Sequence, residues 1–439
     1  MTTAVVRRLR TEVADDLSER LRADETAGRT RLSLDDQRQL GRQLINRRLE
    51  TYAKQQLDAG LDPLDEDAEV ELATAVHDAL FGLGMLQRLL EDDSIENIDA
   101  NGHGEVWVTR ADGTKEQGPP IAESDEELVE TLRMTAARVG LTERRFDVGS
   151  PSLNLRLPDG SRLFAVMAVT SRPSVAIRRH RYPKVFLDDL VGLGTLDHAL
   201  RELLSAAVRA RKNLIVCGGV DAGKTTLLRA LINEISPTER LVTIEDNLEL
   251  GLDRYPELHP DVVALEAREH NVEGEGAVGL ADLVKWGLRM NPDRVIVGEV
   301  RGDEVLPMLN AMSQGNDGSM CTIHSNSSSG AFGKLAMYAV QAPERLGLEA
   351  TNLIVANAID FVVYIGQSGV GARERKARYV ASVREVVGAE GSMVVSNEIF
   401  APRHDGRAIP AAPLRTTTLQ QLEAVGFDPL VLQHTDGWW

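Results

Sequence analysis

The segment Gly218-Gly219-Val220-Asp221-Ala222-Gly223-Lys224-Thr225 indicates the fold of the second half of this chain. The apolar run 213–217 precedes it, and the helix-compatible run 226–231 follows it. A phosphate-binding loop needs this context, because a buried strand delivers the glycine turn and a helix begins at the lysine with its free amides facing the anion. The sequence therefore predicts a P-loop that binds a nucleoside triphosphate. A glycine-rich turn with a surface lysine is the weaker alternative.

The residues of this loop have separate predicted tasks. Gly218 and Gly223 permit backbone angles that curl successive N–H groups around a phosphate. Lys224 is expected to bridge the β- and γ-phosphates of ATP, and Thr225 to supply a hydroxyl to Mg²⁺. Asp221 does not fit this pattern, because a carboxylate near phosphates repels them unless it faces solvent or a cation. We expect Asp221 to be a solvated turn residue. The candidate nucleotide-binding residues of the loop are Gly218, Gly219, Val220, Asp221, Ala222, Gly223, Lys224, Thr225 and Thr226.

Composition limits the class of protein and the kind of partner. At 439 residues and 43% hydrophobic content, the chain is long enough for two or three domains. A net charge of −18 and an aromatic content of 4% argue against direct nucleic-acid binding. The first residues lack a signal-peptide core, no apolar run is long enough to span a membrane, and both cysteines lie in apolar runs. We therefore expect a cytoplasmic protein with reduced, buried thiols.

Five regions are predicted along the chain. Charged, helix-compatible sequence forms an N-terminal extension that ends at an acidic, proline-bearing stretch. A smaller α+β domain follows, with a helix between strand-like runs. Beyond a linker, helical segments alternate with short apolar strands, which predicts an α/β domain with a mainly parallel sheet covered by helices on both faces. The regions are residues 1–65 (helical extension), 66–180 (α+β domain), 181–190 (linker), 191–400 (α/β nucleotide-binding domain) and 401–439 (C-terminal tail).

Polar side chains follow three of the predicted strands. Because ligands of open α/β sheets lie at the carboxyl ends of strands, Glu299 is expected beside the phosphates, where it would polarise the attacking water and contact Mg²⁺. His324 ends another strand, and we expect it to make a hydrogen bond that changes when the γ-phosphate leaves. The acidic group Glu245, Asp246 and Glu249 is expected to bind Mg²⁺ through water or to orient the nucleophile. Each acidic cluster alone is typical of a solvated strand-to-loop junction, and a lone histidine in a strand is typical of a packing residue. The order of these groups after a P-loop favours a catalytic site.

These four elements in this order resemble the type II/type IV secretion ATPase superfamily. They correspond to its P-loop, aspartate box (245–249), Walker B segment (295–299) and histidine box (315–324). The Walker B form Gly298-Glu299-Val300-Arg301-Gly302 is distinctive, and it adds Arg301 to the candidate catalytic residues. Segments that look like the CpaF-like branch lie at 83–86, 97–102, 156–162 and 384–391. The resemblance covers roughly residues 70–400. The chain departs from the family at Val220-Asp221-Ala222, where Thr-Gly-Ser is common, and it lacks the four-cysteine metal module of many type II secretion ATPases.

The resemblance implies a hexameric motor that uses ATP and Mg²⁺, with a RecA-like ATPase domain joined to the smaller N-terminal domain. Such a motor would dock on inner-membrane platform proteins and power assembly or retraction of a Flp/Tad-type pilus, or a related secretion machine. The resemblance also implies N-terminal arginines that reach the phosphates, for which the candidates are Arg156, Arg162, Arg178 and Arg179. Two alternatives stay open: a motor for conjugative DNA transfer, and a weakly hydrolysing, nucleotide-gated scaffold.

Overall fold

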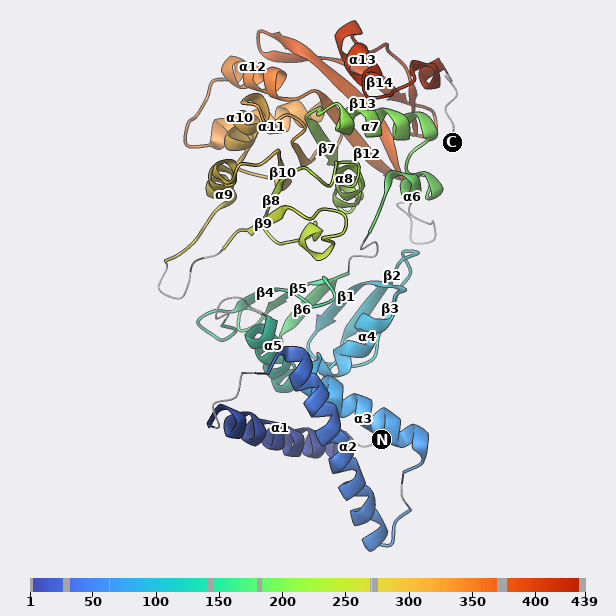
Figure 1. Cartoon of the computed structure of the whole chain (residues 1–439), viewed down its shortest axis with the longest axis vertical. Coiled ribbons are helices and arrows are strands. Elements are labelled where there is room, and N and C mark those ends of the chain that lie inside the picture. The colour runs from blue at the N-terminus through green and yellow to red at the C-terminus, as the bar shows by residue number, and fades with distance from the viewer. Residues whose placement is uncertain are drawn as a thin grey trace. The chain divides into compact units, whose positions relative to one another are not determined.

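The computed structural model divides the chain into two compact units, Met1–Arg181 and Tyr182–Trp439 (Figure 1). Each unit has hydrophobic cores of its own. The residues that the structure describes are 3–26, 32–62, 64–139, 145–179, 184–268, 270, 275–368 and 377–433. The first residues of the predicted linker, 181–183, lie outside these ranges.

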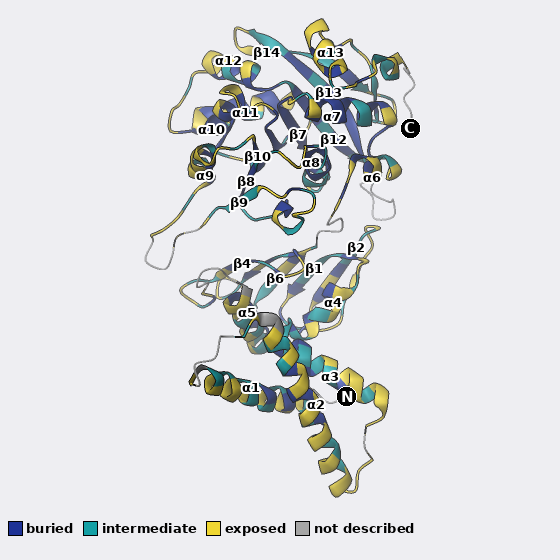
Figure 2. Cartoon of the chain, viewed as in Figure 1, coloured by how far each residue is buried: buried dark blue, intermediate teal, exposed yellow. Residues whose placement is uncertain are grey.

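The first unit begins with a three-helix bundle of α1 (Thr3–Thr26), α2 (Leu34–Asp58) and α3 (Glu66–Phe81). Ser33 starts α2 through a capping box with Asp36, and the side chain of Asp65 accepts the Ala68 amide to start α3. The predicted boundary at residue 65 therefore divides this bundle. A weakly amphipathic pair of helices cannot close a core alone, and α3 supplies the third wall. The shared buried residues are Leu9, Val13, Leu44, Ile45, Leu49, Leu72, Val76 and Leu80. The C-terminal end of α2 is largely exposed (Figure 2).

A six-stranded antiparallel sheet completes the first unit. Its order is β3-β2-β1-β6-β5-β4, and α5 (Asp125–Val139) packs on one face. Strand alternation buries apolar side chains on this covered face, and the opposite face carries polar side chains together with the exposed Trp107 and Phe164. The strands are β1 (Ile95–Asn101), β2 (Val106–Arg110), β3 (Lys115–Gln117), β4 (Ser152–Arg156), β5 (Arg162–Val166) and β6 (Ser174–Arg178); η1 (Gly84–Leu86) and α4 (Gln87–Glu91) precede them.

The second unit contains a nine-stranded sheet of order β15-β14-β13-β12-β7-β11-β10-β8-β9. The six strands from β12 to β9 run parallel, and β13, β14 and β15 extend the sheet in antiparallel fashion. The parallel strands are almost continuously apolar because both of their faces are covered. The strands are β7 (Leu214–Gly218), β8 (Leu241–Glu245), β9 (Val262–Glu266), β10 (Arg294–Val300), β11 (Met320–His324), β12 (Phe361–Ser368), β13 (Ala377–Glu390), β14 (Met393–Pro402) and β15 (Ala408–Pro410).

Helices cover this sheet on both faces and form a three-layer domain (Figure 1). One layer contains α6 (Leu187–Gly192), α7 (His198–Arg209), α8 (Lys224–Ile232) and α13 (Thr416–Glu423). The other contains α9 (Leu280–Gly287), α10 (Val305–Ser313), α11 (Gly330–Gln341) and α12 (Leu348–Ala358). Short helices η2 (Leu252–Arg254), η3 (Leu288–Met290) and η4 (Pro429–Gln433) complete the unit. The predicted α/β class, with a mainly parallel covered sheet beside a smaller α+β unit, is confirmed.

Two predicted boundaries of this unit differ from the structure. Residues expected in the linker form α6, because Leu187 and Leu190 are apolar and bury against the core. The expected tail is also structured, since β14 continues to Pro402 and β15 pairs with it. Beyond β15, Leu422 and Phe427 are buried in the same core as α7 and α8. Proline and arginine content indicated a tail separate from the domain, but these apolar side chains anchor the segment to the sheet layer.

Candidate functional site

The candidate site lies where four parallel strands end. Strand β7 leads into the P-loop, and its neighbour β11 ends at His324, which lies in register with Gly218. The next strands, β10 and β8, carry Glu299 and Glu245. The carboxyl ends of parallel strands meet at one edge, so the sheet brings these side chains together.

The P-loop ends at the N-terminus of α8. Gly223 is the N-cap residue, with a φ of 96° in the left-handed region that favours glycine, and no side chain caps the helix there. The first amides of α8 are therefore left to an anion, as in other helix-terminal phosphate sites. The Lys224 ammonium donates to the Gly219 carbonyl at 2.9 Å and lies 3.2 Å from Nδ1 of His324. Thr225 and Thr226 follow in the first turn and are half-buried.

Glu299 of β10 and His324 of β11 lie next to each other at the ends of their strands. Nε2 of His324 lies 2.7 Å from Oε1 of Glu299, and each side chain is about 40% exposed (42% and 39%). That oxygen is buried and accepts no hydrogen bond within the described residues, despite the short approach of the ring. A buried carboxylate oxygen without a donor calls for water or another ligand. Lysine, histidine and glutamate thus converge from α8, β11 and β10.

Glu245 occupies a different position from Glu299. It is 3% exposed, and its Oε1 accepts the backbone amides of Glu249 and Leu250, each at 2.9 Å. The adjacent strand makes room for it, because a Cβ on Gly298 would lie 2.9 Å from Cγ of Glu245. Glu245 therefore anchors the turn after β8 through this oxygen, and its part in binding Mg²⁺ through water or in orienting the nucleophile stays a prediction.

The other predicted acids lie nearer the surface. Asp246 accepts from Nη2 of Arg301 at 2.6 Å, so the structure joins the aspartate box to the end of the Walker B strand. The side chain of Arg301 is 57% exposed. Glu249 is half-buried, and its backbone amide is the group that Glu245 holds.

Three of the four candidate arginines form one row in the first unit. Arg156 lies directly opposite Arg162, which lies opposite Arg178, so their side chains share the face of the sheet that α5 does not cover. Arg179 does not join them. Its guanidinium donates to the carbonyl of Ile95 at 3.2 Å and pairs with Asp93. Strand alternation explains this, since consecutive residues point to opposite faces.

Two residues near the site were missed by the sequence analysis. Glu304 is 2% exposed and accepts the amides of Arg301 and Gly302, which fixes the chain after β10. It is the N-cap residue of α10, but its side chain does not cap that helix, so no capping pattern in the sequence marks it. Arg378 pairs with Asp221 across 157 positions of sequence, and no local pattern indicates that contact.

The arrangement fits a magnesium–nucleotide complex. The uncapped helix terminus and the Lys224 ammonium suit phosphates, and the Thr225 hydroxyl and the Glu299 carboxylate suit Mg²⁺. The described residues contain no group of three or more His, Cys, Asp or Glu that could hold a metal ion by itself. Mg²⁺ in such sites keeps several waters and takes one or two protein ligands together with the phosphates, so a complete protein cage is not required.

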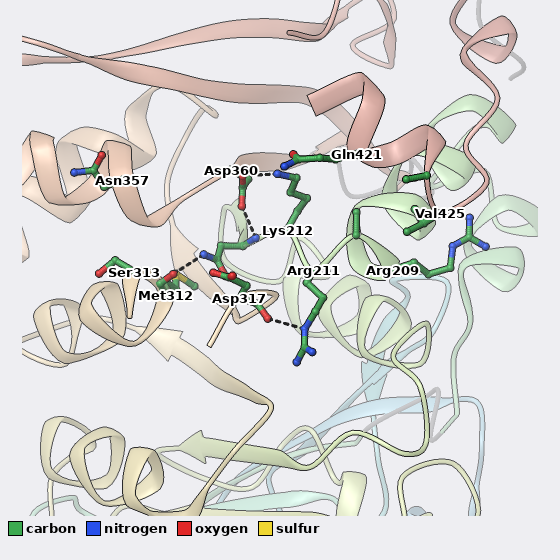
Figure 3. A pocket seen from close by; sticks show the side chains of 13 residues that line it. Arg209, Arg211, Lys212, Met312, Ser313, Asp317, Asn357, Asp360, Gln421 and Val425 are labelled. Atoms are coloured by element: carbon green, nitrogen blue, oxygen red, sulfur yellow. Dashed lines mark hydrogen bonds and ion pairs between the residues drawn. The ribbon is translucent and has the colours of Figure 1, made fainter. Parts of the chain in front are cut away.

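A second feature, a pocket of about 610 Å³, lies at the amino ends of the strands, away from the P-loop edge (Figure 3). Its polar groups are engaged with one another: Lys212 pairs with Asp360 at 3.1 Å, and the Asn213 side chain donates to the Met312 carbonyl at 2.8 Å. These contacts fix the turns that lead into β7 and β12. The pocket therefore has a structural explanation.

The fold and the site define a P-loop protein with a RecA-like nucleotide-binding domain and a smaller N-terminal domain. The chain belongs to the type II/IV secretion system protein family, whose profile matches residues 80–364. Among the described residues, none of the helices has the length and apolar character needed to cross a membrane.

Two relatives at 30% identity or more agree with this assignment. Over 326 residues the chain is 33% identical to a Mycobacterium tuberculosis (strain H37Rv) protein named for conjugal transfer. The match covers 72% of this chain and 88% of that protein. It is 30% identical to the conjugal transfer protein TrbB of Rhizobium radiobacter, over 67% of this chain and 86% of that protein. A solved structure of the VirB11 ATPase from the Brucella suis type IV secretion system is 27% identical, covering 73% of this chain and 97% of that one, with a TM-score of 0.37.

Proposed function

We propose that the chain hydrolyses ATP and uses the energy to drive a membrane-associated secretion or pilus machine. The observation that supports hydrolysis most strongly is the convergence of Lys224, His324 and Glu299 beside the open N-terminus of α8. Hydrolysis of a phosphoanhydride depends chiefly on positioning and on stabilisation of charge.

Each of these residues has a distinct part in the proposal. The α8 amides and Lys224 would hold the phosphates, and Thr225 would supply its hydroxyl to Mg²⁺. Glu299 orients and polarises the attacking water, for which its buried oxygen is the acceptor. His324, within reach of both Lys224 and Glu299, responds to loss of the terminal phosphate. For the basic row Arg156, Arg162 and Arg178, the part in phosphate binding that the resemblance implies stays a prediction.

Family membership and the CpaF-like sequence segments support a proposal for the work of the motor. We propose a homohexamer in the cytoplasm, docked on inner-membrane platform proteins, that assembles a Flp/Tad-type pilus. Conjugative transfer is the second candidate, and the relatives named for conjugal transfer support it. The two are distinguished by the genes beside this one, since pilin genes favour the first and relaxase genes the second. DNA stimulation of the ATPase rate would favour conjugation.

The experiment that tests hydrolysis is steady-state phosphate release by the purified full-length chain with MgATP. We expect turnover in the wild type and its loss in Lys224→Ala, because a neutral side chain cannot balance the charge on the β- and γ-phosphates. Wild-type protein that binds ATP but releases no phosphate in any oligomeric state would contradict the proposal and favour a nucleotide-gated scaffold.

A further inference from the structure

The P-loop of this chain carries an acid where phosphates must approach. Asp221 lies three positions before Lys224 and adopts a φ of 59°, in the left-handed region. Aspartate tolerates this region better than most residues with a side chain. Its carboxylate nevertheless adds a negative charge to a loop whose predicted ligand is a polyanion.

Arg378 contacts Asp221 through both the backbone and the side chain. Its Nε donates to the Asp221 carbonyl at 3.1 Å, and its Nη2 lies 3.4 Å from Oδ2. The side chains are 27% and 30% exposed, so water screens the pair only in part. The arginine stem also lines the loop, since a Cβ on Gly223 would lie 3.4 Å from Cδ of Arg378.

Strand β13 fixes the position of this arginine. Arg378 lies in register with Gln367 of β12, and two residues earlier Ile365 of β12 lies in register with Gly218. Further along β13, the side chain of Arg384 donates to Ser328 at 3.0 Å, in the segment that follows His324. The strand therefore contacts both the P-loop and the chain after β11, and it holds Arg378 against the loop.

We infer that Arg378 is a positioning residue for the P-loop, which neutralises Asp221 and holds that carboxylate away from the phosphates so that an acidic loop binds a nucleoside triphosphate. The two N–H donors of the planar Arg378 guanidinium balance the charge of the Asp221 carboxylate and also fix its orientation. A lysine at this position would balance the charge without fixing the orientation. The inference rests on the proposed function, because it concerns the affinity of the same nucleotide site.

A double-mutant cycle on nucleotide affinity tests this role. The variants are Arg378→Ala, Asp221→Asn and the double substitution, and the probe is MgATP with a fluorescent group on the ribose. Asparagine keeps the shape of aspartate and tolerates a positive φ. Arg289→Ala, at an exposed arginine of η3, is the matched control. Thermal unfolding of every variant separates a folding defect from a binding defect.

The inference predicts that Arg378→Ala alone weakens MgATP binding by about tenfold, the size expected for one uncompensated charge near a surface. Asp221→Asn in that background is expected to restore affinity to within about twofold of the wild type. If Arg378→Ala weakens binding by the same factor in the Asp221→Asn background, Arg378 contacts the phosphates directly and the positioning role is wrong. An Arg378→Ala variant that binds like the wild type would also overturn it. A wild-type chain that binds no MgATP would instead remove the proposed function, and the inference with it.

Discussion

Nε2 of His324 lies 2.7 Å from Oε1 of Glu299, and Nδ1 of the same ring lies 3.2 Å from Nζ of Lys224. One imidazole therefore connects the P-loop lysine to the acid at the end of β10. When a triphosphate occupies the loop, Lys224 is expected to turn toward it and change its distance from the ring. The histidine is in the right place to link the nucleotide state to the position of Glu299.

Substitution of Glu299 by glutamine should separate binding from hydrolysis. Glutamine keeps the size of the side chain but cannot accept a proton or polarise water as a carboxylate does. We expect kcat to fall by about 100-fold or more, with the Kd for MgATP within about threefold of the wild type. Single-turnover phosphate release and equilibrium binding measure the two quantities.

Glu266→Gln is the matched control for this experiment. Glu266 ends β9, which β8 separates from β10, and it lies in register with Glu245. The control should keep the wild-type kcat. Equal losses in both variants would mean that any strand-end carboxylate matters, and Glu299 would have no special role.

The rule that functional side chains lie at the carboxyl ends of parallel strands predicted which residues of the site lie close together. Apolar runs with a P-loop predicted the five central strands and the edge at which Glu299 and His324 meet, because parallel strands end together. The same rule could not separate Glu299 from Glu245. That difference arises from Gly298, which lies beside Glu245 on the neighbouring strand, and strand register is not visible in a single sequence.

The sequence alone also could not predict contacts between residues far apart in the chain, or the boundary between the helical extension and the next domain. The contact between Asp221 and Arg378 depends on where β13 joins the sheet. The helix α3 belongs to the helical bundle because its apolar face packs against α1 and α2. Arg179 is a different case. Because consecutive residues of a strand point to opposite faces, the sequence itself predicts that the side chain of Arg179 points away from that of Arg178.

Gly298→Ala should lower both stability and activity. The new Cβ would approach Cγ of Glu245 to 2.9 Å, and relief of that clash would move Glu245 from the amides of Glu249 and Leu250. We expect a loss of about 1–3 kcal/mol in the free energy of unfolding, together with slower ATP hydrolysis. Urea denaturation and phosphate release measure the two effects.

Gly333→Ala gives the contrasting control. Gly333 is exposed in α11, and no atom lies within 4 Å of a Cβ at that position. Alanine favours helix, so we expect a gain of about 0.5–1 kcal/mol and unchanged hydrolysis. If Gly298→Ala is as stable as the wild type, the close approach to Glu245 is relieved at no cost and the packing argument is wrong.

The two thiols should resist alkylation in the folded protein. Cys217 and Cys321 lie on the neighbouring strands β7 and β11 and are buried, and burial raises the pKa of Cys217 to about 12. The reactive thiolate is therefore scarce at pH 8, and reagents cannot reach it. We expect no reaction with a thiol-specific dye in native buffer and two labelled cysteines in urea. Labelling of native protein faster than its global unfolding would show a local opening beside the P-loop.

Acidification should weaken the second unit through His259. This imidazole is buried, its Nε2 lies 3.1 Å from Oδ1 of Asn233, and burial lowers its pKa below the usual 6.5. Since the folded state disfavours the charged ring, the unfolded chain binds more protons between the two pKa values. The associated stability is present above pH 6.5 and is lost as the pH falls through the folded pKa. We expect the Tm to drop between pH 7.5 and 5 by less in His259→Gln than in the wild type. The exposed His404 serves as the control, and His404→Gln should retain the full drop. Equal pH dependence in all three proteins would mean that His259 is hydrated in the folded state, contrary to its burial.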